Sequence, residues 1–332
     1  MERAEGLLKR LADGKYYSGE ALGRDFKVSR AAIWKLIQKI ESDYGLSIYA
    51  VKGKGYRLAE PLQLLNKHVI ESQLSQDTIN ALSNIELFYD IDSTNHYLNS
   101  KSLEGAQSGY VVLAEQQTKG QGRRGRKWVS PFGSNLYLSL LWRFQLSPVQ
   151  LGCLSLFIAV AIVRVLHNLG IKEVGVKWPN DIYYQDKKLG GILLEMRAEA
   201  NGPSNVVIGI GLNLNMPITK ETGREDMLHE IEQPWFDLKS IMKKDIDRNQ
   251  IAALVINSLF TVLNDIPEKQ IELLNEWQEM DILKGKIVDV HLTDKVITAT
   301  AMGINESGAL KVLHNKKEII CHSADLSIRP KN

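Results

Sequence analysis

The chain has 332 residues, 44% of them hydrophobic, and a formal charge of +2, which is typical of a globular protein with two or three domains. Its two cysteines, Cys153 and Cys321, are far apart with no Cys or His at ligand spacing, which argues against a disulfide scaffold and a zinc site. The longest apolar stretch, residues 151–163, is shorter than the roughly 20 residues that span a bilayer. No signal peptide is recognised, so we expect a cytoplasmic protein without membrane association.

Positive charge is concentrated at the front of the chain, where residues 1–60 hold 12 Lys and Arg against 8 Asp and Glu. Residues 18–41 have the pattern of two helices joined by a tight turn, with Ser18 and Ser29 in the N-cap positions. The second helix has an apolar stripe at the spacing i, i+3, i+4 and i+7, formed by Ile33, Leu36, Ile37 and Ile40. Its other faces carry small and basic residues, as in a helix that enters a major groove.

Two short β-type runs follow on either side of residues 52–55, where glycines permit a tight turn and two lysines can contact phosphate. Residues 1–62 are therefore predicted to form a winged helix-turn-helix DNA-binding domain. The residues expected to contact DNA are Ser29, Arg30, Ala31, Trp34, Lys35, Lys52 and Lys54. A three-helix protein-interaction domain with a solvated basic face is the alternative interpretation.

The polar stretch Asp92-Ser93-Thr94-Asn95 follows an apolar alternating strand, "ELFYDI". These side chains either cap the helix that comes next or face a ligand. The next predicted strand, "GYVVLAEQQT", ends at Gln116 and Gln117. It leads directly into a basic, glycine-rich segment.

That segment, "KGQGRRGRKW" at Lys119–Trp128, contains five Lys or Arg residues and three glycines. It lacks the spacing of a P-loop and the strand-to-helix G-x-G-x-x-G of a dinucleotide fold. Arginine forks match phosphate oxygens, and glycine amides allow close approach of a ligand. The composition predicts a nucleotide-binding loop, hereafter the Gly-Arg loop. A second nucleic-acid site is the alternative.

Two further segments carry candidate site residues. "EVGVKWPNDIYYQDKKLGGILLEM" predicts a strand, a "KWPND" turn and a hairpin with its polar tip at Gln185–Lys188. "NVVIGIGLNLNMP" predicts a glycine-containing strand that ends at Asn213. Structural explanations also exist: a close strand contact for Gly190-Gly191, a solvated turn for Lys187-Lys188 and a packed corner for Trp178-Pro179.

The motifs "DSTN", "AEQQTKGQGRRGRKWVSPFGSNLYLSL", "VKWPNDIYYQDKKLGGILLE" and "IGIGLNLNMP", in this order behind a winged helix, resemble the bifunctional biotin protein ligases that also repress the biotin operon. The resemblance covers nearly the whole chain. It implies an α/β (α+β) protein in three parts: a winged helix-turn-helix in 1–62, a mixed-sheet ligase domain of the class II synthetase-like type in 63–280, and a small SH3-like β-barrel in 281–332.

The resemblance also implies a reaction in two steps. Biotin and ATP give biotinyl-5′-AMP and pyrophosphate, and the biotinyl group then passes to one lysine of the biotin carboxyl carrier protein of acetyl-CoA carboxylase. Mg²⁺ would come with ATP, without a dedicated protein site. With the adenylate bound, a homodimer would bind operator DNA and repress the biotin operon.

Site residues are carried over from the family's motifs. The expected catalytic residues are Arg123, Asp181, Lys188 and Asn213. The expected biotin-binding residues are Ser93, Thr94, Asn95, Gln117, Gly120, Gln121, Arg123, Lys188 and Gly191. The expected ATP- or adenylate-binding residues are Arg123, Arg124, Arg126, Trp128, Asn180, Lys188, Asn213, Trp235 and Arg329.

The sequence departs from the family pattern at Gln121, where many members have arginine, and the segment between Asn213 and Trp235 looks longer than usual. Two other functions remain open. A lipoyl ligase would need a longer apolar slot, and the Gly-Arg and "KWPND" motifs argue against it. A repressor that only senses biotin would not need Arg123, Lys188 and Asp181.

Overall fold

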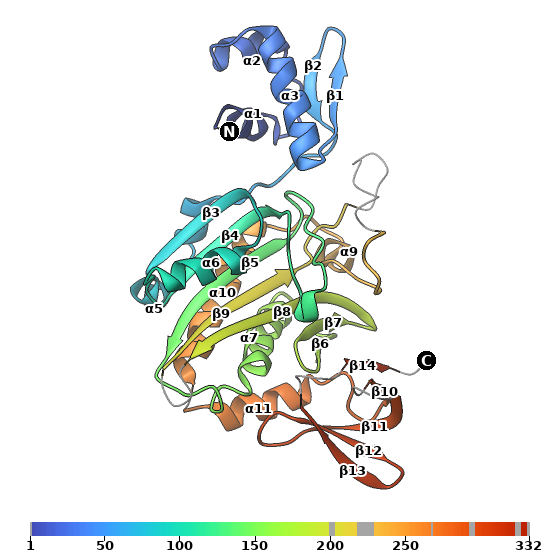
Figure 1. Cartoon of the computed structure of the whole chain (residues 1–332). Helices are drawn as coiled ribbons and strands as arrows, with labels where there is room; N and C mark the ends of the chain where they lie inside the picture. Colours follow the sequence, from blue (N-terminus) through green and yellow to red (C-terminus); the bar gives the residue numbers. More distant parts are fainter. Residues whose placement is uncertain are drawn as a thin grey trace.

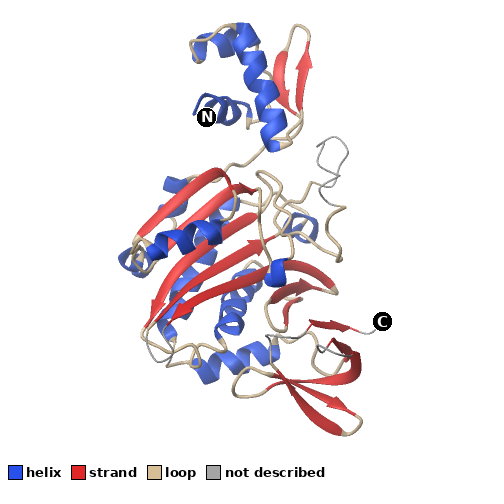
Figure 2. Ribbon diagram, in the orientation of Figure 1, coloured by secondary structure: helices blue, strands red, loops and turns tan. Residues whose placement is uncertain are grey.

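The computed structural model describes residues 2–198, 203–217, 229–266, 268–291, 296–322 and 327–330. Figures 1 and 2 show an N-terminal helical unit with a β-hairpin, a central sheet flanked by helices, and a C-terminal sheet at the end of the molecule away from the N-terminal unit. The central sheet and the loops at one of its ends position the candidate site.

The N-terminal unit is a winged helix-turn-helix in its element order. Its elements are α1 (Glu2–Leu11), α2 (Gly19–Asp25), α3 (Arg30–Tyr44), β1 (Ile48–Val51) and β2 (Gly55–Leu58). The predicted caps are confirmed, because Ser18 accepts a hydrogen bond from the Ala21 amide and Ser29 accepts one from the Ala32 amide. At Gly55, φ is +103° and a Cβ atom would lie 2.1 Å from a backbone oxygen, so the hairpin requires glycine there.

The core of the N-terminal unit includes one side chain from the central region. Ile33, Ile37 and Ile40 are buried as the helical spacing predicts. Phe132, which follows the Gly-Arg loop, is buried in the same cluster, with its ring centroid 4.3 Å from that of Tyr44. The N-terminal unit is therefore packed directly against the segment that leads out of the Gly-Arg loop.

The central region contains a seven-stranded mixed sheet in the order β3-β4-β5-β9-β8-β7-β6. Only β3 and β4 pair in parallel; the other pairings are antiparallel. The strands are β3 (Asn84–Ile91), β4 (Tyr110–Gln117), β5 (Leu136–Phe144), β6 (Val174–Lys177), β7 (Asp181–Tyr184), β8 (Lys187–Ala198) and β9 (Ser204–Leu212). This confirms the predicted mixed sheet, including the hairpin at Gln185–Lys188.

Helices cover both faces of this sheet (Figure 1). On β4, Val112 packs toward α6 whereas Val111 belongs to the core formed with α7 and α10, as the alternation of a strand requires. The helices of this region are α4 (Lys67–Glu71), α5 (Gln76–Ala81), α6 (Thr94–Leu103), α7 (Leu154–Asn168), α9 (Leu238–Met242), α10 (Arg248–Asp265) and α11 (Gln270–Glu279).

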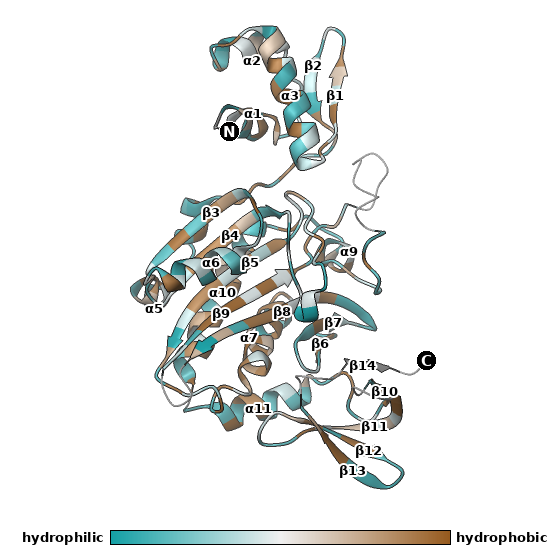
Figure 3. Cartoon of the chain, viewed as in Figure 1, coloured by the Kyte–Doolittle hydropathy of each residue, from teal (hydrophilic) through white to brown (hydrophobic). Residues whose placement is uncertain are grey.

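The longest apolar stretch of the sequence forms α7, as predicted. This helix is apolar on nearly all sides (Figure 3) and is buried between the sheet, α10 and α11. Among the described residues, no helix is both long and apolar enough to cross a membrane.

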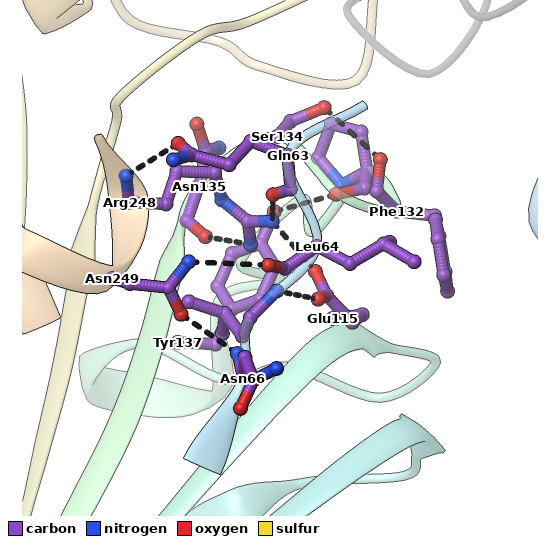
Figure 4. Close-up of polar contacts among 12 residues, drawn as sticks. Gln63, Leu64, Asn66, Glu115, Phe132, Ser134, Asn135, Tyr137, Arg248 and Asn249 are labelled. Atoms are coloured by element: carbon purple, nitrogen blue, oxygen red, sulfur yellow. Dashed lines mark hydrogen bonds and ion pairs between the residues drawn. The ribbon is translucent and has the colours of Figure 1, made fainter. Parts of the chain in front are cut away.

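A buried polar cluster holds the linker, residues 63–66, against the central region (Figure 4). Arg248 donates hydrogen bonds to the carbonyl of Gln63 at 2.8 Å, to Glu115 at 2.7 Å and to the carbonyl of Asn135 at 2.7 Å. Asn249 accepts from the Asn66 amide at 2.7 Å. These contacts tie the chain that leaves the N-terminal unit to β4, to the residue before β5 and to the first turn of α10.

The C-terminal region is an antiparallel sheet in the order β13-β12-β11-β10-β14. Its strands are β10 (Ile287–His291), β11 (Val296–Ile304), β12 (Leu310–His314), β13 (Lys317–Cys321) and β14 (Ser327–Pro330). No pairing between β13 and β14 is found in the described strands, so the SH3-like barrel stays a prediction.

The C-terminal sheet shares its hydrophobic core with the central region. Leu283 and Val288 belong to the same buried cluster as α7. In addition, Trp178 of the "KWPND" turn donates its indole N–H to the Gly308 carbonyl at 3.0 Å. The hydrophobic core is thus continuous across the predicted domain boundary near residue 280. That boundary therefore stays a prediction.

Candidate active site

A cavity of about 930 Å³ lies over one end of the central sheet, between the Gly-Arg loop, the β6–β7 turn and the segment that precedes α9. It brings together most of the predicted ligand-binding residues. Those that line it are Ser93, Thr94, Asn95, Gln117, Gln121, Arg123, Arg124, Arg126, Trp128, Asn180, Asp181, Lys188, Gly191, Asn213 and Trp235. Gly120 is buried behind this lining, where a Cβ atom would lie 2.7 Å from the Trp128 carbonyl.

The floor of the cavity is formed where β3 turns into α6 beside the end of β4. Ser93 caps α6 by accepting from the His96 amide, and it also lines the cavity. Gln117 Oε1 accepts from the Thr94 amide at 2.9 Å and from the Thr94 hydroxyl at 3.0 Å. The two interpretations of the polar stretch at 92–95 are therefore compatible, because capping of the helix leaves polar atoms beside the cavity.

Asn95 is held by protein partners on both sides of its amide. Its Oδ1 lies 2.6 Å from the Ser139 hydroxyl, and its Nδ2 donates to Glu195 at 2.8 Å. Gly209 makes this possible, because a Cβ atom there would be 2.3 Å from Asn95 Oδ1. Sequence analysis missed Ser139 and Glu195. A serine on the otherwise apolar strand "LYLSLLWRF" was the available signal.

The Gly-Arg loop contains one short turn, η1 (Arg123–Gly125), in which Arg124 has φ of +60°. Arg123 donates to Asn180 Oδ1 at 3.1 Å, and Asn180 Nδ2 donates to the Ile192 carbonyl at 2.6 Å. Burial lowers the pKa of Arg123, with a smaller contribution of the same sign from the positive charge of Arg124. The β6–β7 turn thus orients one arginine of the loop toward the cavity.

Lys188 and Asp181 form an ion pair inside the cavity, with 2.8 Å between Nζ and Oδ1 and side chains 14% and 20% exposed. Gly191 lies directly beside this pair, because a Cβ atom there would be 3.3 Å from Lys188 Cε and 3.5 Å from Asp181 Oδ1. The ammonium group also lies 5.4 Å from the Trp128 ring centroid. A lysine with one carboxylate partner and partial exposure is available to an anionic ligand.

One wall is made by the segment before α9. The Lys188 amide donates to the Pro234 carbonyl at 3.0 Å, and the Phe236 amide donates to the Lys188 carbonyl at 2.9 Å. This places Trp235 at the cavity, where we predicted an adenine contact. Residues 218–228 of the predicted long loop lie outside the described residues.

Two other residues were predicted to contact the nucleotide, Asn213 and Arg329, and they lie in different parts of the structure. Asn213 lines the cavity and donates its side-chain amide to the Phe236 carbonyl at 3.1 Å. Arg329 lies on β14, where its backbone pairs with Asp289. Its side chain is outside the described residues, so its contact with the nucleotide stays a prediction.

The predicted DNA contacts lie together on the N-terminal unit, away from the cavity. Residues 29–31, 34 and 35 are exposed or partly exposed at the start of α3, and Trp34 is 53% exposed. Lys52 and Lys54 are exposed at the tip of the β1–β2 hairpin. This is the face that a winged helix would present to a duplex.

The described residues contain no group of three or more His, Cys, Asp or Glu that could hold a metal ion. The oxygen-bearing side chains at the cavity, such as Asp181 and Asn213, fit a metal ion that arrives with a polyphosphate rather than one bound by the protein alone.

Comparisons with known proteins agree with this geometry. Residues 87–213 match the model of the biotin/lipoate A/B protein ligase family, and residues 3–57 match the model of an HTH domain. The first range contains the cavity floor, the Gly-Arg loop and Lys188. The second contains the helix and hairpin that carry the predicted DNA contacts.

The similarity to curated relatives covers nearly the full length. The chain is 40% identical over 305 residues to the bifunctional ligase/repressor BirA of Escherichia coli, covering 92% of this chain and 90% of that protein. It is 27% identical to the corresponding protein of Bacillus subtilis, covering 96% and 95%. A biotin protein ligase from Aquifex aeolicus in complex with biotin and ATP aligns with a TM-score of 0.63 and 28% identity over 75% of this chain and 100% of that chain. The chain thus belongs to the biotin protein ligase family, in the group of bifunctional ligase/repressors.

Proposed function

We propose that the cavity joins biotin and ATP into biotinyl-5′-AMP and then transfers the biotinyl group to a lysine of the biotin carboxyl carrier protein of acetyl-CoA carboxylase. The observation that carries this proposal is the pairing of two chemistries in one cavity. A polar floor at Thr94 and Gln117 lies in the same cavity as Lys188 and Arg123. The polar floor suits a small ring with N–H and C=O groups. The two cationic side chains suit a carboxylate and a phosphate.

The floor would bind the ureido ring of biotin. That ring offers two N–H donors and one carbonyl acceptor, and the hydroxyl and amide groups of Ser93, Thr94 and Gln117 can satisfy both kinds. These groups already bond to one another and to backbone amides, so the ligand pairs with the donors and acceptors that remain. A ligand that displaces water from those remaining atoms without pairing with them loses about 1–3 kcal/mol for each. Specificity for biotin would therefore arise at this end of the cavity.

The cationic end would carry the first step. The biotin carboxylate and the α-phosphate of ATP repel each other, so positive charge at their meeting point lowers the barrier to attack. Lys188 can supply this charge, because its ammonium group lies at the cavity. Its only ion-pair partner among the described residues, Asp181, lies there too. Arg123 would cover the acyl phosphate, and Trp235 would stack on adenine. Mg²⁺ would neutralise charge on the phosphates.

In the second step the lysine of the carrier protein would attack the acyl carbon of the adenylate and displace AMP. Its amine must be neutral to attack, so a hydrogen-bond acceptor near the reacting carbon assists. Asp181 fits this role once Lys188 contacts the phosphate, because its carboxylate is then free to accept from the incoming amine.

A lipoyl ligase is the second enzyme of the matched family. The head group of lipoate is an apolar dithiolane with neither N–H nor C=O. It would offer no hydrogen bond to the polar atoms of Thr94, Gln117 and Ser93 that face the cavity, and it would take these atoms out of water without compensation. The polar floor therefore favours biotin.

Intact mass measurement tests the ligase. The purified chain is incubated with MgATP and a carrier domain, with biotin in one sample and lipoate in another. We expect one biotinyl addition to the carrier and no lipoyl addition. A carrier that remains unmodified with biotin would contradict the proposal.

We further propose that the chain represses the biotin biosynthesis operon as a cytoplasmic homodimer when the adenylate is bound. A single winged helix makes few phosphate contacts and binds weakly at physiological salt, whereas a dimer reads two half-sites. The Gly-Arg loop and residues 230–233 border the cavity, so a bound adenylate could organise them into a dimer surface. Burial of Phe132 between the two units supports a connection between the loop and the N-terminal unit.

Sedimentation and operator binding at one fixed salt concentration test this switch. Both are expected to strengthen with biotin plus ATP, to change much less with biotin alone, and to reverse when acceptor carrier consumes the adenylate. Equal dimerisation and equal DNA affinity in the apo, biotin-bound and adenylate-bound states would contradict the switch and leave the ligase proposal untouched.

A further inference from the structure

Helix α3 carries most of the predicted DNA contacts and is docked on the central region at its last turn. Tyr44, the last residue of α3, is 7% exposed, and its ring centroid lies 4.3 Å from that of Phe132. The buried ring of Phe132 also lies 6.1 Å, between centroids, from the ring of Tyr89 on β3. Lys9 of α1 makes a further contact, because its ammonium group lies 5.7 Å from the Tyr89 ring centroid. The two units therefore meet through packed side chains from both sides.

The linker leaves no slack between the two units. The Leu62 amide donates to the Ala12 carbonyl at 2.8 Å, which fixes Leu62 to the N-terminal unit. The next residue, Gln63, is fixed to the central region, because its carbonyl accepts from Arg248 at 2.8 Å. Two neighbouring residues are thus held by different units, so the N-terminal unit is not connected by a flexible tether.

Helix α3 turns this docking into a direction for its DNA-contacting end. Figure 1 shows the last turn of α3 toward the central region and its first turn away from it. The 15 residues of the helix extend over about 22 Å at 1.5 Å per residue. A tilt of about 10° at the docked end would therefore move the first turn by about 4 Å, roughly one base-pair step of a duplex.

We propose that Phe132 and the linker fix the orientation of the winged helix, so that the dimer binds two operator half-sites at only one separation. This rests on the proposed function, in which a homodimer binds operator DNA. In a two-fold symmetric dimer, the distance between the two copies of α3 depends on how each copy is docked. Phe132 then determines specificity for the spacing of the half-sites, although it contacts the end of α3 opposite to the predicted DNA contacts.

The test uses the full-length protein saturated with biotin and ATP, and a random pool of DNA duplexes. Selection from this pool gives the preferred half-site and the preferred separation. A second duplex then carries the same half-sites with three more base pairs between them, which adds about 10 Å and about 100° of rotation. Competition binding at one fixed salt concentration gives the ratio of the two affinities.

The unchanged protein should bind the shifted duplex about 100-fold or more weakly, because only one winged helix of the dimer reaches its half-site and the gain from linkage is lost. A double change, called the released variant, combines Phe132→Ala with insertion of Gly-Ser-Gly-Ser between Leu62 and Gln63. The inserted residues give each unit about 11 Å of flexible chain. The ratio should therefore fall to about tenfold or less.

Two further variants keep the test decisive if the released variant folds poorly. The insertion alone leaves the core of the N-terminal unit intact and should narrow the ratio by about threefold or more. Phe26→Ala is the matched control, because Phe26 packs in the same core but belongs to the N-terminal unit itself. It should keep the ratio of the unchanged protein within about twofold, whatever its effect on stability.

The outcomes separate this inference from the function on which it rests. An unchanged protein that binds both duplexes with similar affinity overturns the fixed docking and leaves repression by a dimer intact. A ratio that is as large in the released and insertion variants as in the unchanged protein also overturns it. Selection that yields no paired half-sites contradicts the proposed repressor function itself.

Discussion

The molecule contains two ion pairs of nearly equal length in different surroundings. Arg248 and Glu115 are 2.7 Å apart with side chains 3% and 1% exposed, and the arginine also donates to the carbonyl of Gln63 in the linker and to that of Asn135, just before β5. Lys188 and Asp181 are 2.8 Å apart but face the cavity. The two pairs have similar distances but different exposure, so the surroundings of an ion pair decide its role. A closed pair holds two parts of the chain together, whereas an open pair can exchange its partner for a substrate.

The closed pair should give the largest effect on stability. Arg248→Leu leaves Glu115 as an uncompensated buried charge and removes two hydrogen bonds to backbone carbonyls. We expect a loss of about 3–5 kcal/mol in the free energy of unfolding, measured by urea denaturation. The matched double variant Glu115→Leu/Arg248→Leu should lose less, because no charge is left unpaired. A single variant within about 1 kcal/mol of the unchanged protein would show that the cluster does not hold the linker.

The open pair should give the opposite result. Lys188→Ala removes the positive charge where carboxylate and phosphate meet, so adenylate formation should slow by about a hundredfold or more. The free energy of unfolding of this variant should fall by less than that of Arg248→Leu, because the side chains of the open pair are 14% and 20% exposed, against 3% and 1% for the closed pair. Biotin-dependent pyrophosphate release measures the first quantity and urea denaturation the second. Unchanged pyrophosphate release would remove Lys188 from the catalytic residues.

Arg123 lines the same cavity as the open pair, but it lies on the Gly-Arg loop. Arg123→Gly should release the adenylate about tenfold faster, because one charge-assisted hydrogen bond to it is lost. Escaped biotinyl-5′-AMP would then modify lysines of a bystander protein, detected by mass spectrometry of added albumin. Arg197→Gly on β8 is the control, because its side chain is exposed and is not among the cavity-lining residues. Labelling confined to the carrier domain in the Arg123 variant would contradict this role.

A third carboxyl group, that of Asp281, extends the comparison because it forms no ion pair with any residue that the structure describes, although the charge of Lys284 acts on it weakly. Its Oδ2 has no hydrogen-bond partner among the described residues, and burial raises its pKa to about 6. The folded state holds this proton more tightly than the unfolded chain. The protein therefore loses stability as pH rises from about 4 to about 6, because the buried carboxyl must ionise. At pH 7 the folded state carries the full cost of this buried negative charge.

Asp281→Asn should accordingly stabilise the protein at pH 7, by about 3 kcal/mol at most. The gain should disappear near pH 4, where the carboxyl is protonated in both states. Urea denaturation at the two pH values measures the difference. A variant that is less stable at pH 7 would show that the ionised carboxylate has a favourable partner.

Local patterns in the sequence were sufficient where the interaction itself is local. Ser18 and Ser29 cap helices as predicted, and β4 delivers Gln117 to the cavity, because caps and strand alternation depend on neighbours in the chain. The order of the motifs also identified which residues line the cavity. These predictions needed no knowledge of which distant segments meet.

Contacts between distant segments were not predictable in the same way. Arg248 meets Glu115 across 133 residues of chain, and Glu195 meets Asn95 across 100. Phe132 follows a basic loop and has no pattern of its own, yet it completes the core of the N-terminal unit. Each of these residues depends on the register of the central sheet or on the docking of two units, neither of which a single sequence displays.

The central claim is that this cavity forms an adenylate from biotin. Exchange of labelled pyrophosphate into ATP, measured on the full-length protein without a carrier domain, tests it most directly because it isolates the first step. We predict exchange that requires biotin, is absent with lipoate and falls by about a hundredfold in Lys188→Ala. Exchange that is absent with biotin, or equally fast with lipoate, would contradict the account.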